Sequence, residues 1–443
     1  MTARQAPFVV AVAAALVGLA IGLALRGVEP AATWLYHAAW YPTIVAMAAL
    51  VARREGQDPL TANPLHALSL FSWSAVFWFF FELLNWRLHN WYYVNVPAGR
   101  IERWVGVALA FATVLPAIFL AARALESWAA FRDLRVPAMR VTPLGLRLTT
   151  LSGVVFMVLP LAWPQTFFPL VWGATTLLAE PALYRRARHW SLIGDLERGD
   201  LGRIARLLAG GAGIGLMWEL YNSIARSRWI YTVPGLENFK LFEMPLLGFL
   251  GFPVFALECW SVFHLLACFG ISTPEEPAGP PPRLRRKVAT AAIGVGFAFL
   301  VLAGMDRFTI GSTTPQLLDV PGLPASAAFR LGATGTSPFE LAREPANEVA
   351  RATDASVDEA LAWIQTARLV TLRGIGTHNA RRLLQIGVRD VADLARQDPD
   401  SLAARLGDGA GRRAGPASAP PLPTPAQIRV WVKAARLATD RPG

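Results

Sequence analysis

The chain has 443 residues, of which 54% are hydrophobic and only 16% are charged, and its net charge is +11. Soluble domains carry about 25% charged residues, so this composition excludes an ordinary soluble protein and favours one that has lipid as its solvent. In such a protein, an excess of arginine is more often a sign of topology than of nucleic-acid binding. The two cysteines, Cys259 and Cys268, exclude a disulfide framework and a cysteine-rich zinc site.

Nine apolar segments have about the 20 residues that are needed to cross a bilayer core of ~30 Å. The first could instead be a signal peptide, but it is long for one and no small-residue cleavage site follows it, so we expect a retained helix. The expected membrane helices cover residues 8–27, 32–52, 66–86, 104–123, 148–163, 166–182, 205–225, 241–270 and 288–305.

Two stretches of the sequence resemble each other: 81–97 reads FELLNWRLHNWYYVNVP, and 218–234 reads WELYNSIARSRWIYTVP. A duplicated membrane domain explains the resemblance. If each copy holds four helices, the even number gives both copies the same orientation, so they are parallel repeats. The residue pairs that share an offset of 137 are Glu82 and Glu219, Asn85 and Asn222, Pro97 and Pro234, and Pro116 and Pro253.

These observations predict an all-α polytopic membrane bundle, made of two parallel four-helix repeats plus one helix, with a small soluble helical domain after it. The expected boundaries are 1–137 and 138–271 for the repeats, 272–306 for the ninth helix, 307–355 for a linker and 356–443 for the C-terminal domain. The linker is expected because 307–355 has little regular pattern and includes several prolines.

The distribution of lysine and arginine predicts the orientation. The loops on one side of the predicted membrane hold 18 of these residues, and those on the other side hold seven. The richer side is expected to be cytoplasmic. The N-terminus is then cytoplasmic, and the nine helices place the C-terminal domain outside the cell membrane.

A duplicated pair of polar residues is the candidate catalytic site. Glu82 and Asn85 share a helix face, and Glu219 and Asn222 do the same. A carboxylate in a lipid-exposed span is costly, so both glutamates are expected to point into the bundle. If they lie close together, they would share a proton or a cation. The alternative is a hydrogen-bonded network that only holds the helix ends.

Aromatic and titratable residues near the same outer layer are candidates for binding a ligand. The alternative for each Trp or Tyr is an interfacial aromatic belt, and no His spacing resembles a metal motif. A run of glycines and prolines at 243–253 predicts a break or kink in the eighth helix. The candidate ligand-binding residues are His37, Trp91, Tyr93, Trp229, Tyr231 and Glu243.

The C-terminal region has clear helix signals. Ser356 and Glu359 form a capping-box pair, and Thr424 with Pro425 begins the last helix. The region from about 356 to 438 resembles a helix-hairpin-helix domain. The residues that carry the resemblance are Gly374, Ile375 and Gly376, followed by Ala380, Leu383, Leu384, Gly387, Val388 and Leu394.

This resemblance implies a turn whose backbone N–H groups can hold a DNA phosphate. The residues that would bind a phosphate or a partner are Arg373, Gly374, Gly376, Thr377 and Arg381. Because the region is only mildly basic and is expected outside the cell, a protein partner or the outer loops at Trp91 and Trp229 are favoured over nucleic acid.

Two classes of function remain open. The first is a membrane enzyme or carrier that binds or processes a lipid-like ligand at the outer leaflet through Glu82 and Glu219. The second is a membrane-anchored scaffold, or a tethered DNA-binding protein, that acts through its helix-hairpin-helix domain. Membrane lipids are the partners that the composition implies. The sequence does not indicate a cofactor, a metal or a reaction.

Overall fold

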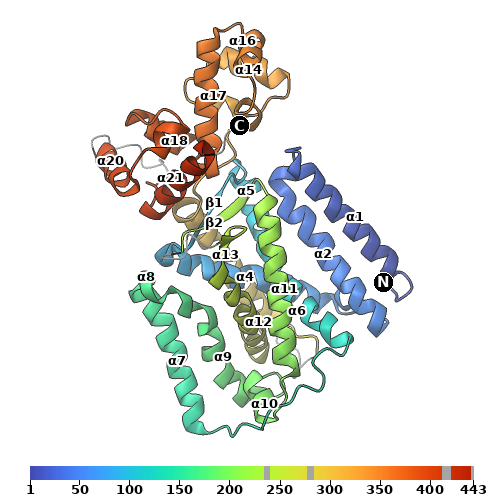
Figure 1. Cartoon of the computed structure of the whole chain (residues 1–443). Helices are drawn as coiled ribbons and strands as arrows, with labels where there is room; N and C mark the ends of the chain where they lie inside the picture. The colour runs from blue at the N-terminus through green and yellow to red at the C-terminus, as the bar shows by residue number, and fades with distance from the viewer. Residues whose placement is uncertain (234–239, 277–283, 412–420, 441–443) are drawn as a thin grey trace. The chain divides into compact units, whose positions relative to one another are not determined.

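The computed structural model describes residues 1–233, 240–276, 284–411 and 421–440, which form an all-α fold with two small two-stranded sheets (Figure 1). Pro234, the expected counterpart of Pro97, lies outside these residues. The chain divides into two compact units. Unit 1 consists of Met1–Asn90, Trp104–Arg226 and Val233–Ala303, and unit 2 consists of Trp91–Arg103, Ser227–Thr232 and Gly304–Gly443.

Long helices make up most of unit 1. Helix α5 (Arg100–Ala112) begins in unit 2, and α13 (Leu284–Phe308) ends there. The other helices of unit 1 are α1 (Ala6–Leu25), α2 (Ala31–Glu55), α3 (Pro59–Ala62), α4 (Pro64–Leu88), α6 (Val114–Ser127), α7 (Pro143–Ala162), α8 (Pro164–Phe167), η1 (Phe168–Leu170), α9 (Val171–Arg186), α10 (Leu192–Glu197), α11 (Gly202–Ile224), η2 (Leu246–Leu250) and α12 (Gly251–Cys268).

Local chemistry explains where several of these helices begin. The Asn63 side chain accepts a hydrogen bond from the His66 N–H at the start of α4, and Thr142 does the same for Gly145 at the start of α7. Proline follows each cap, where its missing N–H costs nothing. Helix α9 is interrupted at Gly173, whose φ of 106° is open to glycine but strained for other residues.

Among the described residues, seven helices are long and apolar enough to cross a membrane, as expected of a multi-pass membrane protein. Two expected spans are not among them. Helix α9 has only 16 residues, and α11 combines several glycines with the polar residues Glu219 and Asn222, which lower its hydropathy. The seven are Ala6–Leu25, Ala31–Glu55, Pro64–Leu88, Arg100–Ser127, Pro143–Ala162, Leu246–Cys268 and Arg285–Phe308.

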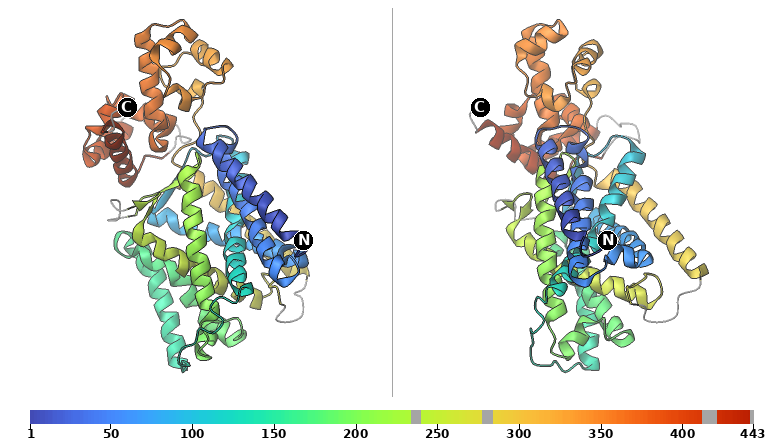
Figure 2. Two further views of the ribbon diagram at one scale, coloured as in Figure 1. Left: turned by 45° about the vertical axis from the view of Figure 1, so that its right-hand side comes forward. Right: turned by 90° about the vertical axis from the view of Figure 1, so that its right-hand side faces the viewer.

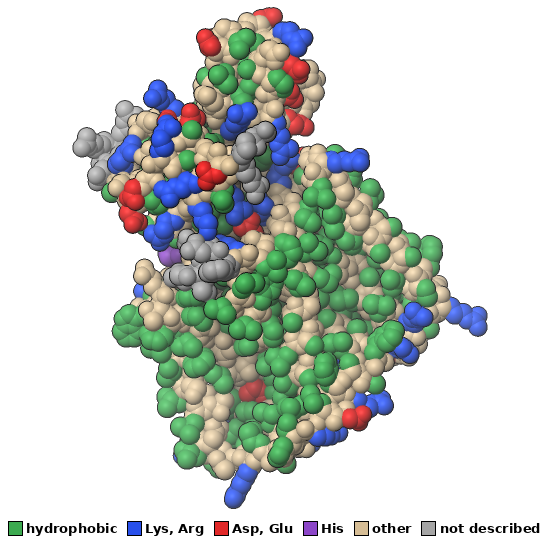
Figure 3. Space-filling model, viewed as in Figure 1, with side chains coloured by type: hydrophobic (Ala, Val, Ile, Leu, Met, Phe, Trp, Pro, Cys, Tyr) green, Lys and Arg blue, Asp and Glu red, His purple; other side chains and the backbone are tan. Residues whose placement is uncertain are grey.

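The surface of unit 1 agrees with lipid as its solvent. On the face shown in Figure 3, hydrophobic side chains cover the region of α1, α7 and α11. Large apolar side chains such as Phe8, Leu19 and Leu148 are more than half exposed. In water such a surface would favour aggregation, whereas lipid chains solvate it.

Small residues allow the helices of unit 1 to approach closely. Helix α1 lies beside α2 (Figure 2), and α11 packs on both α6 and α12. On α11, a Cβ atom added at Gly210 would lie 3.1 Å from the backbone of Ala122 in α6, and one added at Gly211 would lie 2.7 Å from Ala256 in α12. Glycine therefore permits two helix contacts on neighbouring faces of α11, as is common in membrane bundles.

Unit 2 combines the C-terminal domain with two loop segments that leave α4 and α11. These segments form β1 (Trp91–Val94) and β2 (Arg228–Tyr231), which pair antiparallel. Residues 309–314 follow the other edge of β1, where the Tyr93 N–H donates to Thr309 and the Gly311 N–H donates to Tyr93, both at 2.8 Å. The helices of unit 2 are η3 (Leu317–Asp319), α14 (Ala325–Ala333), α15 (Pro338–Leu341), α16 (Ala346–Thr353), α17 (Val357–Thr371), η4 (Leu372–Gly374), α18 (Gly376–Gln385), α19 (Val391–Ala395), α20 (Pro399–Gly411) and α21 (Pro425–Thr439).

The segment 307–355 was expected to be a linker, but it carries the three short helices α14, α15 and α16, which share a core with α17. Their apolar side chains pack around Trp363 and Ile364 of α17. A second core, on the other part of α17, includes Leu369 and Trp431. The short helices escaped prediction because each has fewer than ten residues, which is too short for a clear helical period.

The predicted caps in the C-terminal domain are confirmed. Ser356 and Glu359 form a reciprocal capping box at α17, and Thr424 forms one with Gln427 at α21, where Pro425 is the first helical residue. One face of the last helix is buried as well; its buried residues include Ile428, Trp431, Val432 and Ala435.

Acidification is expected to weaken the helix starts of unit 2. Backbone N–H groups donate to Glu359, Asp393 and Asp398, and these bonds hold the pKa of each carboxyl below its usual value. An acid whose pKa is lower in the folded state contributes stability that is lost as the pH falls through the lowered value. Hydrogen exchange, corrected for intrinsic rates, should show lost protection in α17, α19 and α20 between about pH 5 and about pH 3.

Helix α14 provides the internal control for this acid effect, because no side chain caps its start at Pro324. Its protection should change less over the same pH range. An equal loss in α14, α17 and α19 would contradict the assignment to the capping carboxylates.

Candidate functional site

Two helices of unit 1 carry four polar side chains that are fully buried. Glu82 and Asn85 belong to α4, and Glu219 and Asn222 belong to α11; each is 0% exposed. They are the four residues that the sequence predicted as a catalytic set. Because burying a carboxylate among apolar helices is costly, each helix must provide these groups with polar surroundings.

Aromatic rings bring the two helices together. The ring centroids of Trp78 in α4 and Trp218 in α11 are 5.2 Å apart. The Trp78 indole N–H donates to Oε1 of Glu82 at 3.2 Å, and Trp218 directly precedes Glu219 in the chain. Rings that contact this tryptophan pair include Trp40, Phe81, Phe111, Phe252 and Phe255. We call the four buried polar residues, together with Trp78 and Trp218, the acid–aromatic cluster.

Helix α2 also contributes polar groups to the cluster. The Tyr36 side chain hydrogen-bonds with Thr113 and Trp218 and interacts electrostatically with Glu219. Two turns further along α2, Oγ1 of Thr43 lies 2.9 Å from the Tyr221 hydroxyl. Neither threonine was predicted as a site residue. The available signal was a buried hydroxyl group in an otherwise apolar helix, which needs a hydrogen-bond partner.

His37 and Glu243 were also expected near this layer. His37 holds α2 to α5, because its Nε2 lies 2.7 Å from the carbonyl oxygen of Gly106. Glu243 is buried in the turn between β3 (Lys240–Leu241) and β4 (Met244–Pro245). The predicted break in the eighth helix is present, since the 3-10 turn η2 precedes α12.

The four predicted aromatic ligand residues all lie on the sheet of unit 2. Trp91 is opposite Tyr231, and Tyr93 is opposite Trp229. Each is joined to the acid–aromatic cluster through the chain, because β1 follows α4 by two residues and β2 follows α11 by three. The structure therefore divides the predicted ligand set between two compact units.

The predicted phosphate-binding turn packs on its own chain. Gly374 and Gly376 have φ angles of +70° and +73°. A Cβ atom added at Gly374 would lie 2.2 Å from Cβ of Val94 in β1, and one added at Gly376 would lie 2.5 Å from Cβ of Ser312. Arg381 is engaged as well, since its Nη2 donates to the carbonyl oxygen of Asp319 at 3.0 Å. The turn thus meets one of the loop segments that the sequence proposed as its partner.

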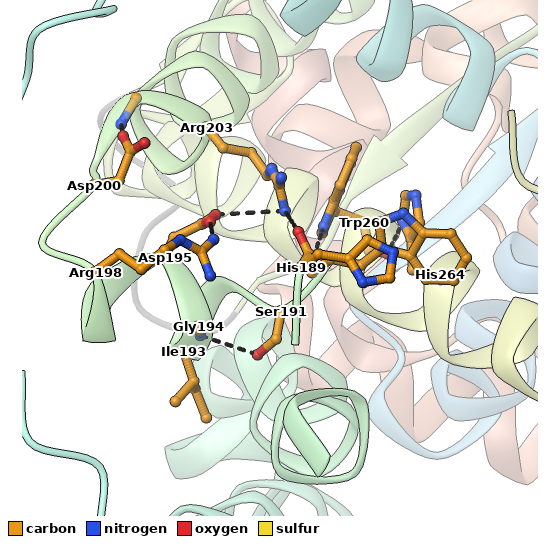
Figure 4. A network of polar contacts seen from close by, with 12 residues as sticks. His189, Ser191, Ile193, Gly194, Asp195, Arg198, Asp200, Arg203, Trp260 and His264 are labelled. Carbon is orange, nitrogen blue, oxygen red and sulfur yellow. Dashed lines mark hydrogen bonds and ion pairs between the residues drawn. The ribbon is translucent and has the colours of Figure 1, made fainter. Parts of the chain in front are cut away.

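A further polar network surrounds the loop between α9 and α11, and the sequence did not indicate it (Figure 4). Asp195 is 3% exposed and forms ion pairs with Arg198 and Arg203. Burial raises the pKa of the Asp195 carboxyl, although both arginines act in the opposite direction. Arg203 also donates to the carbonyl oxygen of His189 at 2.9 Å. This network fixes the loop against α11.

Two more carboxyl groups are buried between α9 and α12. Glu180 accepts hydrogen bonds from the hydroxyls of Ser191 and Ser261, both at 2.7 Å. Glu258, which is 0% exposed, accepts from the Gly173 N–H at 2.7 Å. These acids belong to helices that are distant in sequence, so no local spacing could have paired them. Within the described residues, no group of three or more His, Cys, Asp or Glu side chains is placed to hold a metal ion.

Comparison with known families concerns the C-terminal domain. Residues 334–437 match the family described as "Domain of unknown function (DUF4332)". The match covers most of the region that resembles a helix-hairpin-helix domain, and it begins earlier, within the segment that was expected to be a linker. Comparisons with curated proteins and with solved structures found no match.

Proposed function

We propose that this chain is a multi-pass membrane protein that binds or processes a lipid-like ligand at the acid–aromatic cluster. The contact between Trp78 and Trp218 carries this proposal, because it joins two helices that each bury a Glu and an Asn. Carboxylates within membrane helices are costly and are typical of functional sites. Aromatic walls suit the apolar part of a lipid, while carboxyl and amide groups suit its polar end.

The helix bounds support a duplicated membrane domain. Helix α1 (Ala6–Leu25) and α7 (Pro143–Ala162) are offset by 137 residues at both ends, which is the offset that separates Glu82 from Glu219. Helices α6 and α12 begin at Val114 and Gly251, again 137 residues apart. Helix α4 shifted by the same number covers 201–225, and α11 covers Gly202–Ile224. A single duplication explains all of these coincidences.

The register of β1 and β2 supports the same relationship. Trp91 pairs with Tyr231, and Val94 pairs with Arg228. With the offset of 137, Arg228 is the counterpart of Trp91, and Tyr231 is the counterpart of Val94. The first residue of each strand therefore faces the last residue of the other, as a two-fold axis through the middle of the pair requires. Such an axis suits parallel repeats whose equivalent helices meet at one site.

The proposed location is the outer leaflet of the cell membrane. The arginine distribution favours a cytoplasmic N-terminus. Glu82 and Glu219 lie in the last two turns of α4 and α11, toward the ends that lead to β1 and β2. In this orientation those ends are the outer ones, and the C-terminal domain lies outside as well.

Exchange of both glutamates for glutamine tests the proposal. Glu82→Gln combined with Glu219→Gln keeps side-chain size and hydrogen-bonding capacity while removing both acidic groups. We expect the double variant to fold but to lose the lipids that copurify with the wild-type protein, as measured by mass spectrometry of the detergent-purified protein. Loss of a charge-assisted hydrogen bond of about 1.5–3 kcal/mol corresponds to a decrease in bound lipid of roughly 10- to 100-fold.

Glu276→Gln is the matched control, because Glu276 is exposed and lies outside the helices. Its lipid content should equal that of the wild type. If the double variant folds and retains the same lipids in the same amounts, the acid–aromatic cluster has only a structural role.

The second candidate function is a membrane-anchored scaffold. The close packing of Gly374 on Val94 favours it, because the turn of the C-terminal domain is already held by a membrane loop. In a scaffold, the exposed faces of unit 2 would bind a protein partner; nucleic acid is the less favoured ligand because the turn is occupied. Unchanged lipid content in the double glutamine variant would favour this function.

A further inference from the structure

The two carboxyl oxygens of Glu258 differ in their hydrogen bonds within the described part of the chain. Its Oε1 accepts hydrogen bonds from the Gly173 N–H at 2.7 Å, the Thr175 N–H at 3.0 Å and the Thr175 hydroxyl at 2.9 Å. Its Oε2 is buried and has no hydrogen-bond partner among the residues that the structure describes, and Oγ1 of Thr176 is in the same situation. The Thr176 backbone also interacts with Glu258, so the two atoms belong to one neighbourhood.

A path of polar groups continues from this point along α9 and α12. Ser261 follows Glu258 by three residues and therefore shares its helix face. The Ser261 hydroxyl donates to Oε1 of Glu180 at 2.7 Å, and Oε2 of Glu180 accepts from Ser191, which lies just before α10. At this end, Arg198 is 46% exposed, so the path leads from the middle of α12 to a loop that reaches solvent. Figure 4 shows Ser191 and Arg198 at this loop.

The first half of the chain shows that the fold does not require these acids. Helices α2 and α6 pack together, as their counterparts α9 and α12 do. At the offset of 137, the positions of Thr175, Glu180, Glu258 and Ser261 are occupied by Ala38, Thr43, Ala121 and Ala124. A helix pair of this kind therefore packs without either carboxyl group. Burying two carboxyl groups in the second half is costly, and packing alone does not explain it, so we infer that they have a function.

We propose that Glu258 is a proton-binding site and that Glu180 transfers protons between it and the loop before α10. One proton moves in each transfer: Glu180 releases it to the Ser261 hydroxyl and regains one from the loop, Ser261 gives up its own proton to a bridging water, and that water passes one to Oε2 of Glu258, which has no hydrogen-bond partner among the described residues. No electron is exchanged. Oε2 of Glu258 and Oγ1 of Thr176, which have no hydrogen-bond partner among the described residues, are too few to coordinate a metal cation, whereas one oxygen is enough for a proton.

Two other titratable residues, Cys259 and His264, are buried on α12, and Nδ1 of His264 lies 2.9 Å from the carbonyl oxygen of Trp260. Cys259, the next residue, is a buried thiol that interacts with Glu258. From α6, Arg123 binds Glu55 and Glu275, and from α11, Arg203 binds Asp195. The inference goes beyond the proposed lipid site, because it concerns a different helix pair and does not depend on what the acid–aromatic cluster binds.

Infrared difference spectroscopy of the purified full-length protein between about pH 5 and about pH 8 tests the proposal. We expect the C=O band of a protonated carboxyl that changes with pH in the wild type, disappears in Glu258→Gln and persists in Glu276→Gln. Glutamine retains an oxygen that can accept the bonds from Gly173 and Thr175, so the variant should fold. A spectrum of the folded Glu258→Gln variant that equals the wild-type spectrum would overturn the assignment.

The rate at which the Glu258 carboxyl band follows a rapid change of pH tests the path. Glu180→Gln and Ser261→Ala should each slow this response at least about tenfold, since a positioned proton-transfer group typically contributes more than that. If Glu258→Gln does not fold, Ser261→Ala decides, and an unchanged rate in it refutes the path. A band or rate that depends on replacing sodium by choline would show a sodium site instead and would also refute the proposal.

Discussion

Replacing Gly374 by alanine is expected to separate the Gly-Ile-Gly turn from β1 within unit 2. The new Cβ would lie between 2.2 and 2.8 Å from three atoms of the Val94 side chain. Cβ atoms in proteins essentially never come this close to another atom. The φ angle of +70° adds strain of about 1–2 kcal/mol, and the overpacking adds about 1–3 kcal/mol. Hydrogen exchange should report the loss as faster exchange at the amides of Tyr93 and Val96, which bond to residues 309–312.

Gly387→Ala is the matched control for this prediction. Gly387 lies in the same domain and has a φ of +86°, but a Cβ added there would have nothing within 4 Å. The control therefore carries the backbone strain of about 1–2 kcal/mol without the collision. Combining Gly374→Ala with Val94→Gly should recover part of the loss. Equal effects of Gly374→Ala and Gly387→Ala on the β1 amides would refute the role of this contact.

Replacing Gly215 by alanine is expected to disrupt the contact between α11 and α12. A Cβ atom at this position would lie 2.2 Å from Cγ and 2.5 Å from Cβ of Phe252. The ring is held near its backbone and cannot move aside freely, so the overpacking should cost about 1–3 kcal/mol or more. Gly211, one turn earlier, faces the same helix, so α11 cannot easily rotate to relieve the strain. Thermal unfolding in detergent, followed by size-exclusion chromatography, measures the effect.

Gly213→Ala provides the comparison on the same helix. A Cβ atom added at Gly213 has nothing within 4 Å, and alanine in a helix interior is favoured over glycine by roughly 0.5–1 kcal/mol. This variant should be as stable as the wild type or more so. If both variants lower the unfolding temperature equally, the helix contact at Gly215 does not limit stability.

The sequence by itself determined most of the helices and the burial of the two glutamates, Glu82 and Glu219. Lipid imposes a helix length of about 20 residues, so uninterrupted apolar segments such as 8–27 are visible without any knowledge of their neighbours. Capping is equally local, which explains why the starts at Ser356 and Thr424 could be predicted. Glu82 and Glu219 were singled out because each lies in a segment that the sequence predicted as a membrane helix and because their surroundings repeat.

Only the tertiary structure decided which polar groups meet. Trp78 and Trp218 are 140 residues apart in the chain, and their contact depends on how α4 and α11 pack. The same holds for Glu180 with Ser261, whose hydrogen bond joins residues 81 positions apart. A helix face can be derived from periodicity, but its partner is chosen by packing among many apolar faces of similar energy.

The C-terminal region shows the same division between local and non-local information. Its longer helices and caps follow from nearby residues, whereas the short helices within 307–355 gain stability only by packing on Trp363 and Ile364 of α17. The pairing of β1 with β2, and of β1 with residues 309–312, joins segments of four to six residues that have no stable structure alone. Their hydrogen bonds form once the helices bring these segments together. The sequence could therefore predict that the Gly-Ile-Gly turn contacts the loops at Trp91 and Trp229, but not which atoms are in contact.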